Sequence, residues 1–262
     1  MADLAQARTV GAKVRLVPIL LLKNGRCMKG RNFSGLRDTG NPVTAAKVYD
    51  AQRVDELVFL DIAANAENRQ ILFDVVQGVA EQCFMPLTVG GGVRTLEDMR
   101  RLLQTGADKV AFNTAAVERP ALVEEAARTF GSANVVVSID TRLTGGRYEV
   151  WTHSGRQATG LEAVAWTRRM AEAGAGEILV TSIDREGTMT GYDLELISAV
   201  ADAVAVPVIA NGGAGTLQHL VEAVTIGHAS AVAASSIFHF TDQSPIKARS
   251  YMRGAGLHVR AA

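Results

Sequence analysis

The chain has few cysteines, few aromatic residues and no excess of charge of either sign. Cys27 and Cys83 are too few for a disulfide scaffold or a cysteine-rich zinc site, and they favour a reducing, cytoplasmic location. Basic and acidic residues number 27 each, so binding to nucleic acid or to a membrane surface through bulk charge is not expected. The longest apolar run, residues 16–22, is far shorter than the about 20 residues of a membrane helix. Residues 1–12 lack the apolar core of a signal peptide and are expected to form a loose polar leader.

Short apolar segments instead alternate regularly with longer amphipathic segments. The apolar segments are rich in Val, Ile, Leu and Ala without polar alternation, which is typical of strands covered on both faces. Helix starts are indicated by Asn41 before a proline and by capping-box patterns at 95–98 and 159–162. This alternation predicts a single α/β domain over residues 1–262, a (β/α)8 TIM barrel. The expected strands are residues 15–22, 56–61, 86–89, 109–112, 135–140, 177–181, 207–210 and 229–233.

An internal repeat divides the predicted barrel into two similar halves. A shift of 121 residues places Gly91–Gly92 on Gly212–Gly213, and a shift of 119 places Leu21 on Asp140. Two half-barrels of four βα units each produce this pattern. Two separate doubly wound domains also repeat in this way, but each half of this chain is short for such a domain.

Two glycine turns are the first candidate for a binding site. Residues 90–92 and 211–213 follow strands at the carboxyl end of the barrel, where glycine lets the backbone approach a phosphate closely. The same glycines are also compatible with plain tight turns. Because the two turns lie on opposite sides of the predicted mouth, we expect a ligand with two phosphates. The expected binding residues, including the small polar segments after neighbouring strands, are Gly91, Gly92, Asn113, Thr114, Gly212, Gly213 and Ser235.

Asp140 is the candidate catalytic residue, because it ends an otherwise apolar strand. One interpretation is a structural carboxylate that caps the next loop. The other, which we favour, is a general acid or base whose pKa is tuned by burial at the floor of the pocket. The five histidines show no metal-ligand spacing, so neither a metal nor a cofactor is expected.

Four charged residues begin strands at the opposite end of the barrel. They are Arg15, Glu56, Lys109 and Glu177, and their positions predict a ring around the bottom opening. Charges at this end usually serve stability, so the residues alone favour a salt-bridge cluster that closes the bottom.

Several long segments carry a specific resemblance. They include KNGRCMKGRNFSGLRDTGNP (23–42), TVGGGVRTLED (88–98), VVVSIDTR (135–142) and GAGEILVTSIDREGT (174–188). With these segments the chain resembles the cyclase subunit of imidazole glycerol phosphate synthase, a half-barrel-duplicated (β/α)8 enzyme. The resemblance implies a glutaminase partner that docks on the N-terminal face of the barrel and supplies ammonia for cyclisation of a phosphorylated substrate. It implies phosphate roles for Lys29, Gly187 and Ala234 as well, and an ammonia gate formed by Arg15, Glu56, Lys109 and Glu177.

One departure from that family changes the expected chemistry. The family has an aspartate at the ends of strands one and five; Asp140 matches the second, but Leu21 stands at the first. Leucine cannot transfer a proton, a contribution often worth about 10²–10⁴-fold in rate. Glu186 also replaces the family's aspartate in the sixth loop.

Other segments resemble a paralogous branch of the family. EQCFMP (81–86), YEVWTHSG (148–155) and GTMTGYDLELI (187–197) are similar to the acetamidino-modification proteins of surface-polysaccharide sugars. These proteins work with a glutaminase and with a third, amidotransferase component. We therefore predict an ammonia-accepting synthase subunit that forms a C–N bond on a phosphorylated or nucleotide-linked sugar. Two alternatives stay open, which are the ordinary cyclase of histidine biosynthesis and a non-catalytic scaffold that activates a glutaminase.

Overall fold

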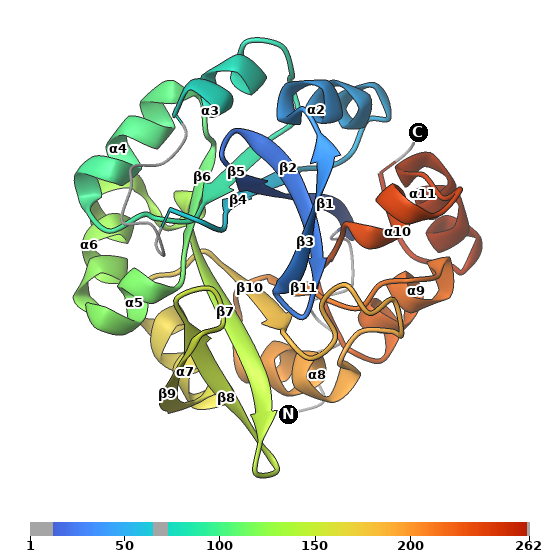
Figure 1. The fold of residues 1–262 in the computed structure, drawn as a ribbon. Helices are drawn as coiled ribbons and strands as arrows, with labels where there is room; N and C mark the ends of the chain where they lie inside the picture. The colour runs from blue at the N-terminus through green and yellow to red at the C-terminus, as the bar shows by residue number, and fades with distance from the viewer. Residues whose placement is uncertain (1–12, 65–72, 261–262) are drawn as a thin grey trace.

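The computed structural model describes residues 13–64 and 73–260, so the predicted leader at residues 1–12 lies outside the described residues. Eight parallel strands form a closed barrel, in which β12 pairs with β1 and β10 pairs with β7 to complete the circle (Figure 1). The predicted (β/α)8 TIM barrel is confirmed, and each predicted segment overlaps one barrel strand. The barrel strands are β1 (Arg15–Lys23), β4 (Leu57–Asp61), β5 (Leu87–Gly90), β6 (Lys109–Phe112), β7 (Val135–Thr144), β10 (Glu177–Ser182), β11 (Val208–Asn211) and β12 (Ala231–Ala234).

Helices surround the barrel, and several begin at signals present in the sequence. Asn41 caps α2, and Thr95 with Asp98 forms the predicted capping box of α4. The capping box predicted at 159–162 is wrong, because Thr159 lies in a strand and Glu162 alone caps α7. The helices are α2 (Pro42–Ala51), α3 (Phe73–Ala80), α4 (Leu96–Thr105), α5 (Thr114–Glu118), α6 (Ala121–Phe130), α7 (Ala163–Glu172), α8 (Leu194–Ala203), α9 (Leu217–Thr225), α10 (Ser236–Phe240) and α11 (Pro245–Gly254), with a 3-10 turn, η1 (Ser132–Asn134).

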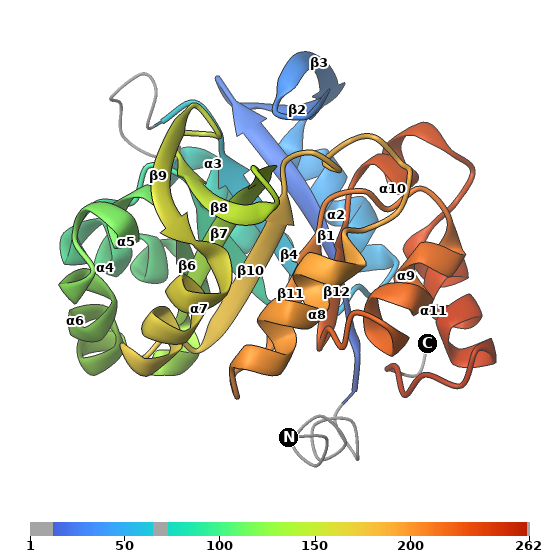
Figure 2. The same cartoon turned by 90° about the horizontal axis from the view of Figure 1, so that it is seen from below.

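Two antiparallel hairpins, which the sequence analysis did not predict, extend the sheet beyond the barrel. β2 (Arg26–Arg31) and β3 (Ser34–Gly40) continue from β1, while β8 (Arg147–Thr152) and β9 (Gln157–Glu162) continue from β7. Figure 2 shows both pairs at the end of the barrel toward which the parallel strands run. They follow the first and fifth barrel strands, which are the equivalent strands of the two predicted half-barrels. Both hairpins therefore border the mouth where the site residues are expected.

Hydrophobic side chains form two separate cores. The larger core lies between the strands and the helices and includes Phe59, Leu102 and Trp166. The smaller core fills the barrel interior with Val17, Ile19, Val58, Ala111, Val136, Leu179, Ile209, Ala231 and Ala233. Because side chains alternate along a strand, the same inward rows continue to Arg15 at one end and Asp140 at the other. The interior is thus apolar in the middle and polar at both ends.

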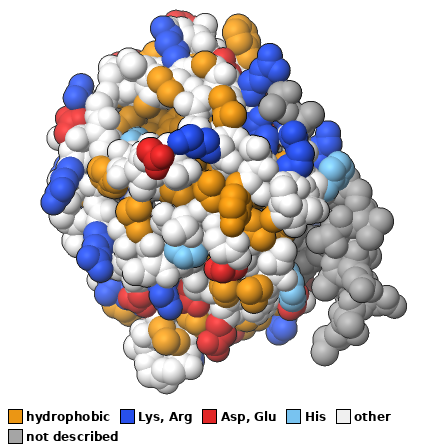
Figure 3. Space-filling view, turned by 90° about the vertical axis from the view of Figure 1, so that its right-hand side faces the viewer, with side chains coloured by type: hydrophobic (Ala, Val, Ile, Leu, Met, Phe, Trp, Pro, Cys, Tyr) orange, Lys and Arg blue, Asp and Glu red, His pale blue; other side chains and the backbone are white. Residues whose placement is uncertain are grey.

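The outer surface is mixed in character. On the side of α9, α10 and α11, hydrophobic side chains lie scattered among polar and charged ones (Figure 3), and the exposed ones include Phe240, Ile246 and Tyr251. Scattered apolar residues are common on protein surfaces and indicate no interface by themselves. Across residues 13–64 and 73–260, no helix has both the length and the apolar character needed to cross a membrane.

Candidate active site

A cavity opens at the mouth of the barrel, where the parallel strands end. The predicted site residues that line it are Lys29, Gly91, Gly92, Asn113, Thr114, Asp140 and Ser235. Gly187, Gly212, Gly213 and Ala234, which were also predicted to bind phosphate, lie outside this lining. Ile19 and Ala111 of the interior core belong to the lining as well, so the cavity reaches down into the barrel.

Asp140 lines the cavity from β7 and is held by a neighbouring amide. Asn113 Nδ2 donates to Asp140 Oδ2 at 3.0 Å and to the Trp151 carbonyl at 2.8 Å, which fixes the orientation of the amide. Burial raises the pKa of Asp140 to about 6, although hydrogen bonds with Asn113 and Thr181 oppose that rise. A carboxyl group with this pKa is mostly ionised at pH 7 and is able to accept and return a proton.

Leu21 lines the same cavity from β1 and gives that wall an apolar character. It pairs in register with Leu60 of β4, and both side chains pack against the interior core. Asp61 also lines the cavity, but its Oδ1 accepts hydrogen bonds from the Ala63 and Ala64 amides, each at 3.1 Å. Asp61 therefore caps the loop after β4, and β1 places no carboxylate at the position equivalent to Asp140.

A buried ion pair joins the β2–β3 hairpin to the loop after β10. Lys29 Nζ contacts Glu186 Oε1, and both residues line the cavity. Burial lowers the pKa of Lys29 to about 8. The family resemblance implied a phosphate role for Lys29 but not this pairing, because no local pattern relates two residues 157 positions apart.

The two glycine turns differ in what they face. Gly91 (φ +88°) lines the cavity, and a Cβ at this position would overlap the carbonyl oxygen of Asp61. Gly213 (φ +110°) packs under the loop that precedes α8, because its carbonyl accepts from the Gly191 amide at 2.9 Å and a Cβ would overlap the Gly191 carbonyl. Close packing therefore accounts for glycine in both turns, but only the glycines of the first turn also line the cavity.

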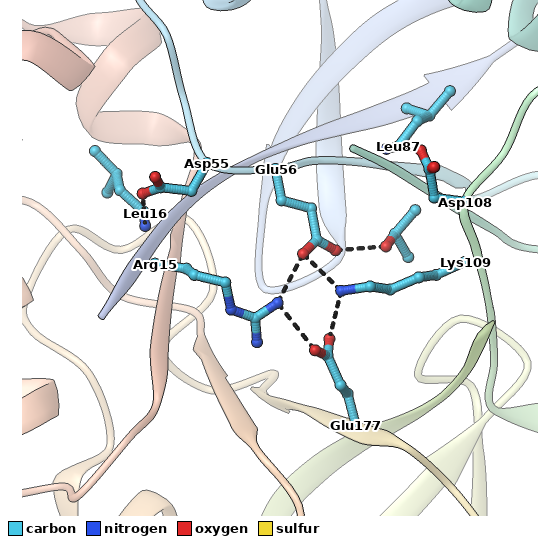
Figure 4. Close-up of polar contacts among 9 residues, drawn as sticks. Arg15, Leu16, Asp55, Glu56, Leu87, Asp108, Lys109 and Glu177 are labelled. Carbon is cyan, nitrogen blue, oxygen red and sulfur yellow. Dashed lines mark hydrogen bonds and ion pairs between the residues drawn. The ribbon is translucent and has the colours of Figure 1, made fainter. Parts of the chain in front are cut away.

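The four charges at the opposite end form a closed ring (Figure 4). Arg15 Nη1 lies 2.8 Å from Glu56 Oε2 and 2.9 Å from Glu177 Oε1. Lys109 Nζ lies 2.8 Å from Glu56 Oε2 and 3.1 Å from Glu177 Oε2. Each cation thus contacts both anions. The ring that was predicted from the positions of these four residues at strand starts is therefore present.

The four side chains of the ring differ in their hydrogen bonds and in their exposure to solvent. Glu56 Oε1 accepts from Thr88 Oγ1 at 2.5 Å, so this carboxylate has three partners. The Glu56 side chain is only 2% exposed, compared with 24% for Arg15 and 17% for Lys109. The carboxylate is therefore fixed, and the two cations form the outer part of the ring.

Residues 15–244 match the model of a family described as "Histidine biosynthesis protein". The match covers most of the chain. This protein belongs to that family. Members of the histidine biosynthesis protein family are barrel enzymes, and the barrel and its mouth cavity agree with such an activity.

In this member of the histidine biosynthesis protein family, the two ends of the barrel have different chemical capacities. The mouth has one carboxylate with a raised pKa, one buried ion pair and a glycine turn that lines the cavity. The bottom has a ring of paired charges without net charge. Among the described residues, no group of three or more His, Cys, Asp or Glu side chains is arranged to hold a metal ion. The arrangement at the mouth is suited to acid–base chemistry.

Proposed function

We propose that this protein is the ammonia-accepting synthase subunit of a glutamine amidotransferase complex, forming a C–N bond on a phosphorylated or nucleotide-linked sugar. One observation carries the proposal. A closed ring of charges lies at one end of the barrel, a single acid–base carboxylate lies at the other, and an apolar interior lies between them.

Ammonia suits this interior better than ammonium does. A charged ion loses its hydration in an apolar passage at a large cost, whereas ammonia is neutral and small. The apolar side chains between the ring and Asp140 therefore favour delivery of the unprotonated nucleophile. A glutaminase bound at the N-terminal face, beneath Arg15 and Lys109, would release ammonia directly under the ring.

The apolar β1 wall supports a reaction other than ordinary cyclisation. Leu21 stands where the cyclase pattern requires an aspartate at the end of the first strand, and Leu60 of β4 lies beside it. The resemblance of three segments to the sugar acetamidino-modification branch agrees with that difference. In that reaction, an acetamido group becomes an acetamidino group with help from a third, amidotransferase component.

The ordinary cyclase of imidazole glycerol phosphate synthase is the second candidate function. The first-loop and glycine-turn segments that resemble the cyclase favour it, and the family match over residues 15–244 is compatible with both candidates.

A scaffold that only activates a glutaminase is the third candidate function. It predicts no product from any sugar substrate, but an increase in glutamine hydrolysis when the chain is added to its partner.

The first prediction separates the enzyme candidates. With ammonium chloride and the phosphoribulosyl formimino aminoimidazole carboxamide ribonucleotide, the native chain should turn over far below the ordinary range of about 1–10³ s⁻¹. Leu21→Asp should raise that rate, because it places a second carboxylate at the mouth. Leu60→Asp, one strand away on the same apolar wall, is the matched control. Turnover of the native chain at an ordinary rate would establish the cyclase instead.

A further inference from the structure

Besides Asp140, the mouth contains a pair of titratable side chains to which the proposed function assigns no role. Lys29 comes from β2, and Glu186 comes from the loop after β10. Both residues are buried, both line the cavity that contains Asp140, and they contact each other. A buried ion pair is costly to form, so its presence in a ligand cavity requires an explanation.

Backbone hydrogen bonds hold this pair in place from two elements. The Glu186 amide donates to the Ser182 carbonyl at 2.9 Å, and the Glu186 carbonyl accepts from the Asn32 amide at 2.8 Å. Asn32 Nδ2 donates to the carbonyls of Ile183 and Asp184 at 2.9 and 2.8 Å. The hairpin and the loop are therefore joined at several points, which fixes the backbone of Glu186, while burial and the contact with Lys29 hold its carboxylate.

One carboxylate oxygen of Glu186 is left over. Oε1 is bound to Lys29, but the buried Oε2 has no hydrogen-bond partner within the described part of the chain. Buried oxygens without a partner are rare in native proteins, and a bound ligand is a common reason for one. Since Glu186 lines the cavity, a hydroxyl or N–H group of the substrate is the donor that would satisfy Oε2.

We propose that Lys29 and Glu186 are the second acid–base centre of this mouth and serve in place of the carboxylate that Leu21 cannot supply. The inference rests on the proposed function. Ammonia attacks the electrophilic carbon of the substrate, the new C–N bond forms, and the electron pair of the C=O π bond moves to oxygen. Lys29 donates one proton to that oxygen, and Asp140 accepts one proton from the attacking nitrogen. The product of the step is a neutral carbinolamine, and Glu186 holds Lys29 and accepts a hydrogen bond from the substrate.

The protonation properties of the two partners agree with this division of roles. Lys29, with its pKa lowered to about 8, is still mostly protonated at pH 7 but gives up a proton more readily than an exposed lysine. Asp140 is mostly ionised at the same pH, which suits a base. Asp61, the other carboxylate in the lining, is occupied by two backbone amides through Oδ1.

Glu186→Gln tests the proposal, because glutamine has the same shape and can still accept a hydrogen bond from Lys29. In the ammonium-dependent reaction on the substrate that the native chain converts, kcat should fall by about 10²–10⁴-fold, with a much smaller change in KM. Glu186→Asp should recover part of that loss. Asp184→Asn is the matched control, since it removes a carboxylate from the same loop but outside the cavity lining.

The pH dependence of kcat distinguishes proton transfer from mere positioning. The native rate should fall below about pH 6, as Asp140 becomes protonated, and above about pH 8, as Lys29 loses its proton. Glu186→Gln removes the anion that favours protonated Lys29, so the alkaline limb should move to lower pH. His239, Asp140, Asp61 and Arg156 are the other charged or titratable groups near Lys29 or in the lining. The pKa of His239 is lowered by burial and by Lys29, so it does not produce the alkaline limb.

The outcomes separate this inference from the function on which it rests. If the native chain turns over and Glu186→Gln keeps a rate within about threefold of it, the acid–base centre is wrong while the synthase function stands. A loss no greater than that of Asp184→Asn, or an unmoved alkaline limb, also rules out the acid–base centre alone. If the native chain forms no C–N bond with any phosphorylated or nucleotide-linked sugar offered, the proposed function is wrong and this inference falls with it.

Discussion

At the scale of single residues, Asp140 and Leu21 occupy corresponding ends of two barrel strands but have opposite chemistry. Asp140 is partly exposed at the cavity beside Asn113 and Thr181, and desolvation at this site raises its pKa to about 6. Leu21 packs against Leu60 and the interior core. Ionising a carboxylate that faces an apolar wall lowers stability, because the folded state binds its proton more tightly than the unfolded chain does.

Asp140→Asn should therefore lower activity and raise stability. The stability cost of ionised Asp140 is absent below the unfolded pKa of about 4, and it grows as the pH rises through about 6. At pH 7.5 the variant should be more stable than the native chain by about 1–2 kcal/mol, and the difference should shrink toward pH 4. The ammonium-dependent kcat should fall by about 10²–10⁴-fold.

Urea unfolding of both chains at pH 4 and pH 7.5 measures the stability difference. Asp184→Asn, an exposed aspartate of the neighbouring loop, serves as the control for a lost carboxylate. A stability difference that is equal at the two pH values would show that folding does not raise the pKa of Asp140.

At the scale of elements, the backbone of the β2–β3 hairpin packs closely against the loop after β10. Gly187, in the loop after β10, has φ +70°, and a Cβ there would overlap the carbonyl oxygen of Gly30 in β2. Asn32 and Lys29 fasten the hairpin to the same loop. The phosphate role that the resemblance implies for Gly187 stays a prediction, and the lack of a Cβ at this position lets the two segments approach each other.

Gly187→Ala should separate the hairpin from the loop. A left-handed backbone conformation costs an alanine about 1–2 kcal/mol, and the overlap with Gly30 adds to that cost. Gly25→Ala is a close control, because Gly25 has φ +72° but no atom within 4 Å of a Cβ. Stability measured by urea unfolding should fall more in Gly187→Ala than in Gly25→Ala, and only the former should lose ammonium-dependent activity. Equal losses in the two variants would mean that the contact with Gly30 has no part in holding the mouth together.

The elements also show how far the sequence was informative. The barrel strands were predictable because each is an apolar run covered on both faces, and Arg15, Glu56, Lys109 and Glu177 were predictable as a ring because strand starts converge at one end. The two hairpins were missed because their outer strands are largely exposed and polar. Asn24–Gly25, between β1 and β2, and Gly145–Gly146, between β7 and β8, all have positive φ and were the available signals, since such pairs favour two-residue turns between antiparallel strands.

The contact between Lys29 and Glu186 could not be predicted from the sequence, for a different reason. It depends on where the β2–β3 hairpin folds back over the mouth, and no local pattern fixes that position. The packing of the loop before α8 over Gly213 was likewise not predictable, because no local pattern brings Gly191 to that position.

At the scale of the whole molecule, the barrel separates a charged ring from an acid–base mouth by an apolar interior. Two cations and two anions neutralise one another in the ring, which lowers the cost of keeping them partly buried. If ammonia enters here, it needs a gap between neutral pairs rather than a charged binding site. Asp55 and Asp108, beside the ring, accept hydrogen bonds from the backbone amides of Leu16 and Leu87, so the strand starts around the opening are held in register (Figure 4).

Two variants of Lys109 decide whether the ring is a gate or only a structural plug. Lys109→Ala opens space and removes a charge, whereas Lys109→Met removes the charge and keeps most of the volume. In the complex reconstituted with the glutaminase of the same genome, a gate that depends on the ion pairs should leak in both variants. Glutamine hydrolysis should then exceed product formation, while the rate with external ammonium salt stays close to native because Asp140 lies at the other end of the interior. Coupling lost in Lys109→Ala but kept in Lys109→Met would assign the seal to side-chain volume. Full coupling in both variants, or no binding of a glutaminase to the ring face, would make the ring a stabilising cluster, as its residues alone first suggested, and ammonia would have to reach the mouth from solvent.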